Sequence, residues 1–136
     1  MIRESDIAYI AGLFDGEGSV YFKKTKQTRH QRPGKPIHNV TVIRMEIAMT
    51  DESILRWIYE VLKVGKVGPR KVRPGRKKQW CWRCSHRDAY YVCCLLYPYS
   101  HVKLDKIHRI INHYDGKIMG GNVVDLELYK KAMALE

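Results

Sequence analysis

The stretch 10–20 reads IAGLFDGEGSV and joins a bare helix face to two carboxylates and then to a strand. As a helix that begins near Asp6, with Ser5 as N-cap, it would carry apolar side chains on one stripe and small ones on another. The small-residue stripe comprises Ala8, Ala11, Gly12 and Asp15. A glycine inside a helix costs about 1 kcal/mol relative to alanine. The stripe therefore predicts a second helix packed closely against this one.

Two glycines mark the end of this helix. Gly16 and Gly18 are expected to terminate it, and residues 20–22 (VYF) begin a strand. Glu17 is therefore predicted to lie on a tight turn between helix and strand.

The stretch resembles the signature of the LAGLIDADG homing endonucleases. Of the nine signature positions, the outright matches are Ala11, Gly12, Leu13, Asp15 and Gly18, and the common substitutions are Ile10, Phe14, Gly16 and Glu17. The resemblance implies a helix that packs against its copy across a two-fold axis. It also implies that the second acidic residue, here Glu17, binds the divalent metals that cleave DNA. The alternative is a sheet-covering helix with a glycine-rich cap.

Chain length and repeat content predict one domain over residues 1–136, with a core over about 5–114 and a C-terminal helix over about 122–135. The motif occurs once and the chain has no internal repeat. The partner helix would then come from a second chain, so a homodimer is expected.

The charge balance points to a polyanionic partner. Lys and Arg number 25 against 14 Asp and Glu, a net charge of +11, which indicates most simply a nucleic acid. The family resemblance implies that this nucleic acid is double-stranded DNA. A structural nucleic-acid-binding protein would share this charge. No signal-peptide pattern or bilayer-length apolar run occurs, so no membrane association is expected. The expected location is intracellular, either the cytoplasm of a prokaryote or the interior of an organelle.

The cysteines invite a zinc interpretation because Cys81 and Cys84 form a C-x-x-C. The segment 79–85 (QWCWRCS) is better explained as a continuous strand, in which residues three apart face opposite ways. Zinc is therefore disfavoured.

Hydrophobic periodicity predicts an α+β fold, an antiparallel four-stranded sheet with helices on one face. The expected strands cover 19–27, 38–49, 66–74 and 79–85. After the motif helix, a helix is expected from Thr50 or Asp51 as N-cap to about 62, with Gly65 as the residue that ends it. Further helices are expected over 87–96, 100–114 and 123–135. Pro98 and Asp115-Gly116 are expected to end the second and third of these helices. The order resembles the family's αββαββα core with its saddle-shaped sheet.

The open face of the sheet and two basic hairpin tips form the predicted DNA platform. Base-edge contacts are expected from Tyr21, Lys23, Thr25, Gln27, Arg44, Glu46, Lys71, Arg73, Gln79 and Arg83, and phosphate contacts from Arg29, Arg32, Lys35, Arg76, Lys77 and Lys78. Any one of them could instead be an ordinary exposed residue.

Phosphodiester hydrolysis in this family implies Mg²⁺, with Mn²⁺ as an alternative, held by Glu17 of each subunit and by the carbonyl of Gly16. Asp15 is either a second acid near the metals or a residue that fixes the helix end by hydrogen bonding, and the structural role is favoured. The segment 98–103 (PYSHVK) resembles the family's turn before its catalytic lysine, which implies that Lys103 stabilises phosphate charge or polarises water. A solvated lysine is the alternative.

Two further positions follow from the resemblance. Asp51 falls where the family keeps a polar residue near the metals, although an ordinary helix cap explains it equally, and Arg56 is the nearest candidate for an arginine beside the site. The expected function is a site-specific, double-strand DNA homing endonuclease of the kind encoded in mobile introns, acting on a long pseudo-palindromic target. The rivals are an RNA maturase that assists intron splicing and a DNA-binding regulator that does not cleave.

Overall fold

A computed structural model describes residues 2–26 and 39–118 of the chain. The predicted hairpin tip over 28–36 and the predicted last helix lie outside the described residues. The described elements are α1 (Glu4–Glu17), β1 (Gly18–Lys26), β2 (Asn39–Met49), α2 (Glu52–Leu62), β3 (Lys66–Arg70), β4 (Gln79–Ser85), α3 (Arg87–Leu96), the 3-10 turn η1 (Tyr97–Tyr99) and α4 (Leu104–Ile118). None of the described helices is long and apolar enough to cross a bilayer.

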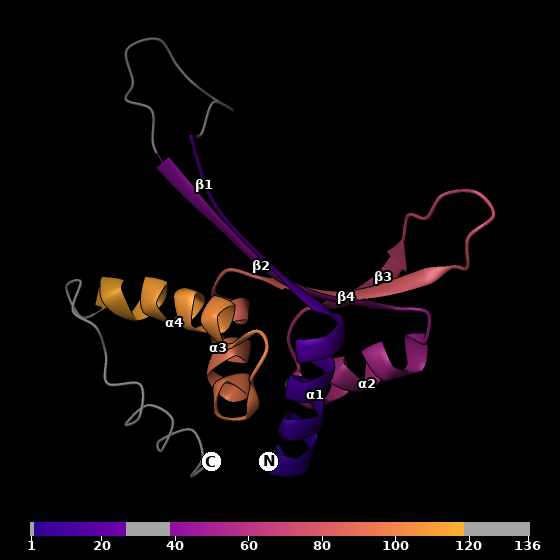
Figure 1. Ribbon diagram of the computed structural model, residues 1–136, viewed down its shortest axis with the longest axis horizontal. Coiled ribbons are helices and arrows are strands. Elements are labelled where there is room, and N and C mark those ends of the chain that lie inside the picture. The colour runs from indigo at the N-terminus through magenta and orange to yellow at the C-terminus, as the bar shows by residue number, and fades with distance from the viewer. Residues whose placement is uncertain (1, 27–38, 119–136) are drawn as a thin grey trace.

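The four strands form one antiparallel sheet in the order β1-β2-β4-β3. Figure 1 shows this sheet bent into a saddle, with α1 to α4 gathered beneath one of its faces. The predicted α+β architecture is confirmed. The described helices cover one face of the sheet, and none of them covers the other, open face.

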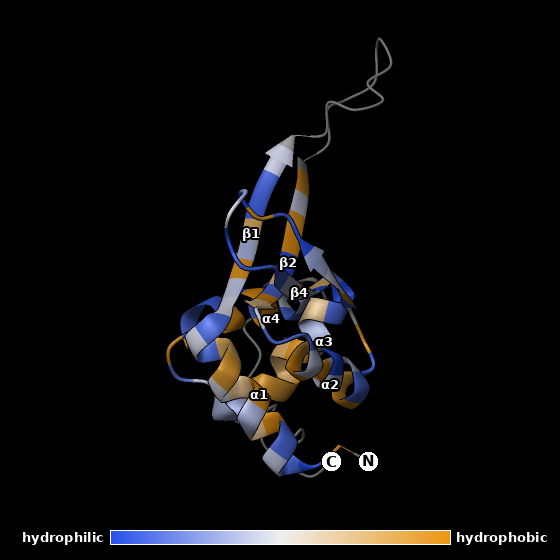
Figure 2. Ribbon diagram, turned by 90° about the vertical axis from the view of Figure 1, so that its right-hand side faces the viewer, coloured by the Kyte–Doolittle hydropathy of each residue, from blue (hydrophilic) through white to orange (hydrophobic). Residues whose placement is uncertain are grey.

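The core lies between the sheet and the helices, and strand alternation determines which side chains enter it. Ile43, Met45 and Ile47 of β2 are fully covered, as are Ile10 and Phe14 of α1. Figure 2 shows the hydrophobic segments of α1, α2 and α3 gathered beneath the sheet. The residues between the buried ones on β2 consequently face outward.

The strand register sets the neighbours on the open face. Tyr21 of β1 pairs with Arg44 of β2, and Glu46 of β2 pairs with Arg83 of β4. Side chains directly opposite each other on one face come within about 5 Å at Cβ, so the register already brings these charged and aromatic groups together.

Helix α2 ends at Leu62 as expected, but a different residue terminates it. Lys63, not Gly65, is the left-handed residue at the helix end (φ +60°), and its N–H donates to the carbonyl of Tyr59. Gly65 has φ +91° in the turn into β3, where a Cβ would lie 2.6 Å from Nε1 of Trp82. Glycine is therefore required there by close approach to the indole, after the helix has ended.

Three other expected boundaries were wrong. Helix α1 begins at Glu4 after Arg3, with no side-chain cap, so Ser5 is not its N-cap. Helix α4 begins at Leu104 and continues through the expected break to Ile118. Asp115 is tolerated there because it is buried and accepts a hydrogen bond from the hydroxyl of Tyr90 (2.5 Å).

Candidate functional site

A network of hydrogen bonds joins the C-terminal end of α1 to the turn before α4. The Asp15 carboxylate accepts the N–H of His101 at Oδ2 (2.8 Å) and the N–H of Lys103 at Oδ1 (3.0 Å). Burial alone would raise the pKa of Asp15, but the backbone N–H groups of Lys103, His101 and Val102 outweigh it and hold the pKa below its usual value. Asp15 thus joins α1 to the beginning of α4, a role that matches the favoured structural interpretation.

Lys103 is brought to the same corner. Its Nζ donates to the backbone carbonyl of Asp15 (3.0 Å), one of the carbonyls that a helix leaves unpaired at its C-terminal end. The ammonium group of Lys103 is therefore held at the C-terminal end of α1, two residues before Glu17. This contact joins residues that are 88 positions apart in the chain.

Glu17 is the last residue of α1, and its side chain is exposed. The chain turns sharply after it because Gly18 presses against the ring of Phe14, where a Cβ would clash, and donates its N–H to the carbonyl of Phe14. The Gly16 carbonyl also belongs to the unpaired last turn. A carboxylate and a carbonyl oxygen at one helix end suit a hard divalent cation.

One chain alone supplies few ligands. Within residues 2–26 and 39–118, no group of three or more His, Cys, Asp or Glu side chains could hold a metal ion. A metal centre built on Glu17 would therefore draw on oxygen ligands other than these side chains, such as a backbone carbonyl, water, a bound phosphate or a second chain.

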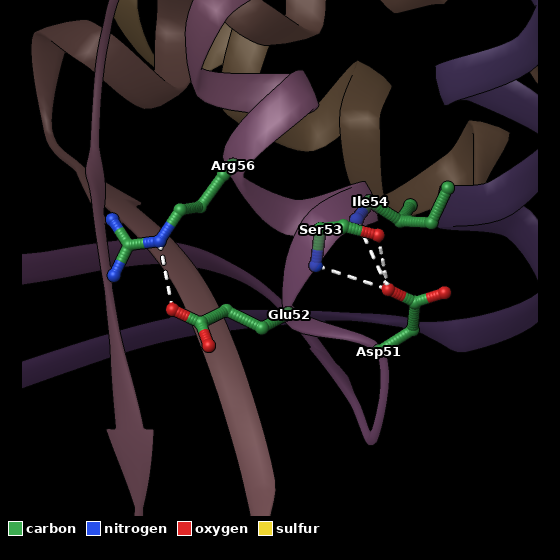
Figure 3. A network of polar contacts seen from close by, with 5 residues as sticks. All are labelled: Asp51, Glu52, Ser53, Ile54 and Arg56. Carbon is green, nitrogen blue, oxygen red and sulfur yellow. Dashed lines mark hydrogen bonds and ion pairs between the residues drawn. The ribbon is translucent and has the colours of Figure 1, made fainter.

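Asp51 and Arg56 form their contacts within α2 (Figure 3). Asp51 caps the helix: its Oδ1 accepts the N–H groups of Ser53 (3.0 Å) and Ile54 (3.3 Å), as its alternative interpretation predicted. These bonds lower the pKa of Asp51. Arg56 donates Nε to Oε1 of Glu52 (2.8 Å) on the exposed side of the helix. These described contacts do not join either residue to Glu17.

The predicted small-residue stripe of α1 is only partly free. Ala11 is fully buried inside the chain, so its methyl cannot contact a partner, and the expectation for that residue was wrong. Gly12 is exposed, and a Cβ on it would meet nothing within 4 Å. Residues 2–26 and 39–118 thus give no packing reason for glycine at this position. Ala8 and Asp15 are partly exposed.

On the β1–β2 half of the open face, Arg44 stacks on an aromatic ring. Its guanidinium carbon lies 5.0 Å from the centre of the Tyr21 ring, a cation–π contact that restrains the arginine without using its N–H donors. Lys23 is exposed two residues further along, and Thr25 donates its hydroxyl to the carbonyl of Val40 (3.4 Å). Gln27, Arg29, Arg32 and Lys35 lie outside the described residues.

On the β3–β4 half, Glu46 pairs with two arginines, Arg83 and Arg70. Arg70 was missed by the sequence interpretation, which extended this strand to 74 and placed Lys71 and Arg73 outward. The strand ends at Arg70, and its cross-strand pairing sets Lys66, Gly68 and Arg70 opposite the outward residues of β4. Val67 and Pro69 are two residues apart and pair with Trp82 and Trp80 of the covered face. This apolar alternation was the signal in the sequence that could have placed Arg70 outward.

The loop between β3 and β4 encloses a basic hollow of about 590 Å³. Its lining residues are Thr50, Arg70, Lys71, Val72, Arg73, Arg76, Lys77 and Gln79. Five of these eight carry a positive charge and none is acidic, which suits a phosphate backbone. Lys78 instead places Nζ 4.5 Å from the centre of the Trp80 ring.

The two cysteines of the C-x-x-C lie in different environments. Cys84 pairs with Met45 on the covered face and belongs to the core, whereas Cys81 pairs with Ala48 and Gly68. Burial raises the pKa of Cys84 to about 12 and, together with the nearby Glu46 carboxylate, raises that of Cys81 to about 11. The Cys81 thiol donates to the carbonyl of Trp82 (3.6 Å). Neither thiol is a ready thiolate ligand.

Comparisons with known proteins agree with this geometry. A family model described as LAGLIDADG endonuclease matches residues 10–101, whereas the search of curated proteins gave no match. The homing endonuclease I-CvuI, solved with the I-CreI target and Mg, is 20% identical, with 85% of this chain and 74% of that chain covered and a TM-score of 0.57.

Two other solved structures are similar. The archaeal intron-encoded homing endonuclease I-Vdi141I, complexed with DNA, gives 16% identity, coverage of 86% of this chain and 71% of that chain, and a TM-score of 0.63. The group I intron-encoded homing endonuclease I-CeuI, also complexed with DNA, gives 15% identity, coverage of 85% and 55%, and a TM-score of 0.57. At these identities the match establishes the fold.

Proposed function

The chain belongs to the LAGLIDADG endonuclease family, and we propose that it is a homodimeric, Mg²⁺-dependent homing endonuclease that cuts both strands of a long, nearly palindromic DNA site. The observation that carries the proposal is the corner at the end of α1. An exposed carboxylate, Glu17, lies there two residues from a carbonyl that binds Lys103.

The chemistry assigned to this corner is hydrolysis of a phosphodiester bond. A divalent ion held there would neutralise phosphate charge and lower the pKa of bound water. Glu17 and the Gly16 carbonyl provide the oxygen ligands from one chain, and the partner's copy would provide the second set. Lys103 would stabilise the charge that develops on the phosphate oxygens. The structures solved with Mg or Ca belong to related proteins and support a divalent metal in general.

Dimerisation is proposed through the free face of α1. Gly12 has open space around it among the residues that the structure describes, so leucine at this position should fold as well as glycine and should raise helix propensity. The same leucine would keep a partner helix from close approach. We expect Gly12→Leu to be a monomer in sedimentation with an unchanged or higher melting temperature. A dimer that survives the substitution would contradict this interface.

The duplex platform is proposed from the open face and the basic hollow. The half-exposed Arg70 and Arg83 above the sheet can reach base edges, and the four cations of the loop that line the hollow can hold phosphates. The target sequence then depends on these side chains, and the two-fold axis makes it nearly palindromic.

The test is incubation of the protein with Mg²⁺ and a randomised duplex library, followed by sequencing of the ends produced. Discrete double-strand cuts at a recurring sequence are expected. Sequence-selective binding without cuts would mean a non-cleaving regulator. Tight RNA binding without either result would favour a maturase and overturn the proposal.

A further inference from the structure

Glu46 lies between two arginines of neighbouring strands on the open face. Its Oε2 is 3.2 Å from Nε and 3.1 Å from Nη2 of Arg83, and its Oε1 is 3.7 Å from Nη1 of Arg70. The Glu46 side chain is only 15% exposed, whereas each arginine side chain is 49% exposed. The carboxylate therefore sits lower, and the arginines reach toward solvent.

The contacts of Arg83 leave its outer edge available. A guanidinium has five N–H donors, and Nε–H and one Nη2–H point to Glu46. The remaining donors on Nη1 and Nη2 form a parallel pair. Such a pair matches O6 and N7 of guanine in the major groove.

Both oxygens of Glu46 are already engaged, Oε2 by Arg83 and Oε1 by Arg70. A carboxylate that reads cytosine needs a free acceptor at the surface. Glu46 is instead low and occupied, so its expected role as a base-reading residue is replaced by a different one.

We propose that Glu46 is a positioning residue for DNA recognition, which orients Arg83 and Arg70 so that both present their donors to guanine edges and which contacts no base itself. The proposal rests on the proposed function and names a determinant of its specificity. Solvent around the half-exposed arginines screens these ion pairs and limits their contribution to stability, so the effect of Glu46 falls on arginine geometry. The carboxylate also lowers the net charge of the cluster, which makes it unfavourable as a phosphate contact.

The experiment selects bound duplexes from a randomised library in EDTA, so that no strand is cut, and sequences them. It compares the wild-type protein with Glu46→Gln, Arg83→Ala, Arg70→Ala and the double variant of Glu46 and Arg83. Glu60→Gln on α2 is the matched control, because it removes the partner carboxylate of Lys63 away from the sheet.

Glu46→Gln should lower base preference about 5-fold or more at the same positions as the two arginine variants. It should keep total library binding within about 3-fold, because removal of a negative charge does not weaken phosphate contacts. The double variant should match Arg83→Ala at the position of Arg83. Glu60→Gln should leave the profile unchanged.

A preference lost at a position that neither arginine affects would mean that Glu46 reads a base, and an unchanged profile would mean that it has no role; both overturn the inference. Glu46→Asp, which keeps the charge but withdraws the carboxylate, should show a smaller loss at the same positions and serves if the glutamine variant does not fold. Wild-type protein that enriches no duplex would instead overturn the proposed function.

Discussion

The corner at the end of α1 and the open face of the sheet are both polar, but different kinds of bond hold them. At the corner, the Asp15 carboxylate accepts backbone N–H groups, and Lys103 binds a backbone carbonyl. On the open face, Arg44 rests on a ring and Arg83 on a carboxylate, both through side chains alone.

The difference follows from what each region is proposed to do. Catalysis requires reacting groups held within a fraction of an ångström, which backbone bonds achieve. Base recognition tolerates side chains that rotate, and a face held by side chains can change its specificity without loss of the fold. Substitutions at the corner should therefore affect chemistry and stability, and those on the face should affect sequence preference.

The largest expected effect is at Glu17. Glu17→Gln keeps the size of the side chain but removes the anionic ligand, so cleavage should fall by roughly 100-fold or more while duplex binding without metal stays nearly constant. Single-turnover kinetics on a selected target measure cleavage, and fluorescence anisotropy measures duplex binding. Asp6→Asn, at the other end of the same helix, is the control. If Glu17→Gln cleaved as fast as the wild type, the corner at the end of α1 would have no role in catalysis.

The next effect is on stability at Asp15. Asp15→Asn places an amide NH₂ opposite a backbone N–H and loses a charge-assisted hydrogen bond, so unfolding free energy should fall by about 1–3 kcal/mol. Urea unfolding at matched protein concentration measures this. Asp105→Asn, an exposed carboxylate in the first turn of α4, should change stability much less. If Asp15→Asn left the free energy of unfolding unchanged, the contact between α1 and the turn before α4 would not depend on Asp15.

The pH dependence sharpens the same assignment. Because the folded pKa of Asp15 lies below its ordinary value of 3.8, its stabilisation is fully present above that pH and is lost as the pH falls through the folded pKa. The stability difference between wild type and Asp15→Asn should therefore be constant near neutrality and shrink below about pH 3.8. A difference that persists in strong acid would contradict the backbone-bonded carboxylate.

Sequence alone predicted the parts governed by local pattern. Alternation of Ile43, Met45 and Ile47 gave the covered face of β2. Capping preferences narrowed the N-cap of α2 to Thr50 or Asp51, and Asp51 is the cap. The glycines of the motif gave the transition from helix to strand near Glu17, although the helix continues through Gly16 and includes Glu17. Such features depend on neighbours close in the chain.

The remaining features depend on contacts between distant segments. Asp115 stays helical because Tyr90, 25 residues earlier, bonds to it. The outward face of β3 depends on pairing with β4, and an error of one residue exchanged Arg70 for Lys71 and Arg73. The bonds of Asp15 to the turn before α4 join positions whose proximity the sequence does not reveal.

The smallest expected effect tests the other side of the comparison, at Arg44. Arg44→Ala should relax preference at one symmetric pair of base positions, by about 1–3 kcal/mol if the contact is bidentate, and leave stability and Mg²⁺ cleavage of the best site little changed. Arg109→Ala is the matched control, because that arginine also stacks on a ring (4.1 Å from Phe22) but belongs to α4. Library selection measures both. Equal weakening on all sequences would place Arg44 on a phosphate, and the open face would then recognise bases mainly through the arginines that Glu46 holds.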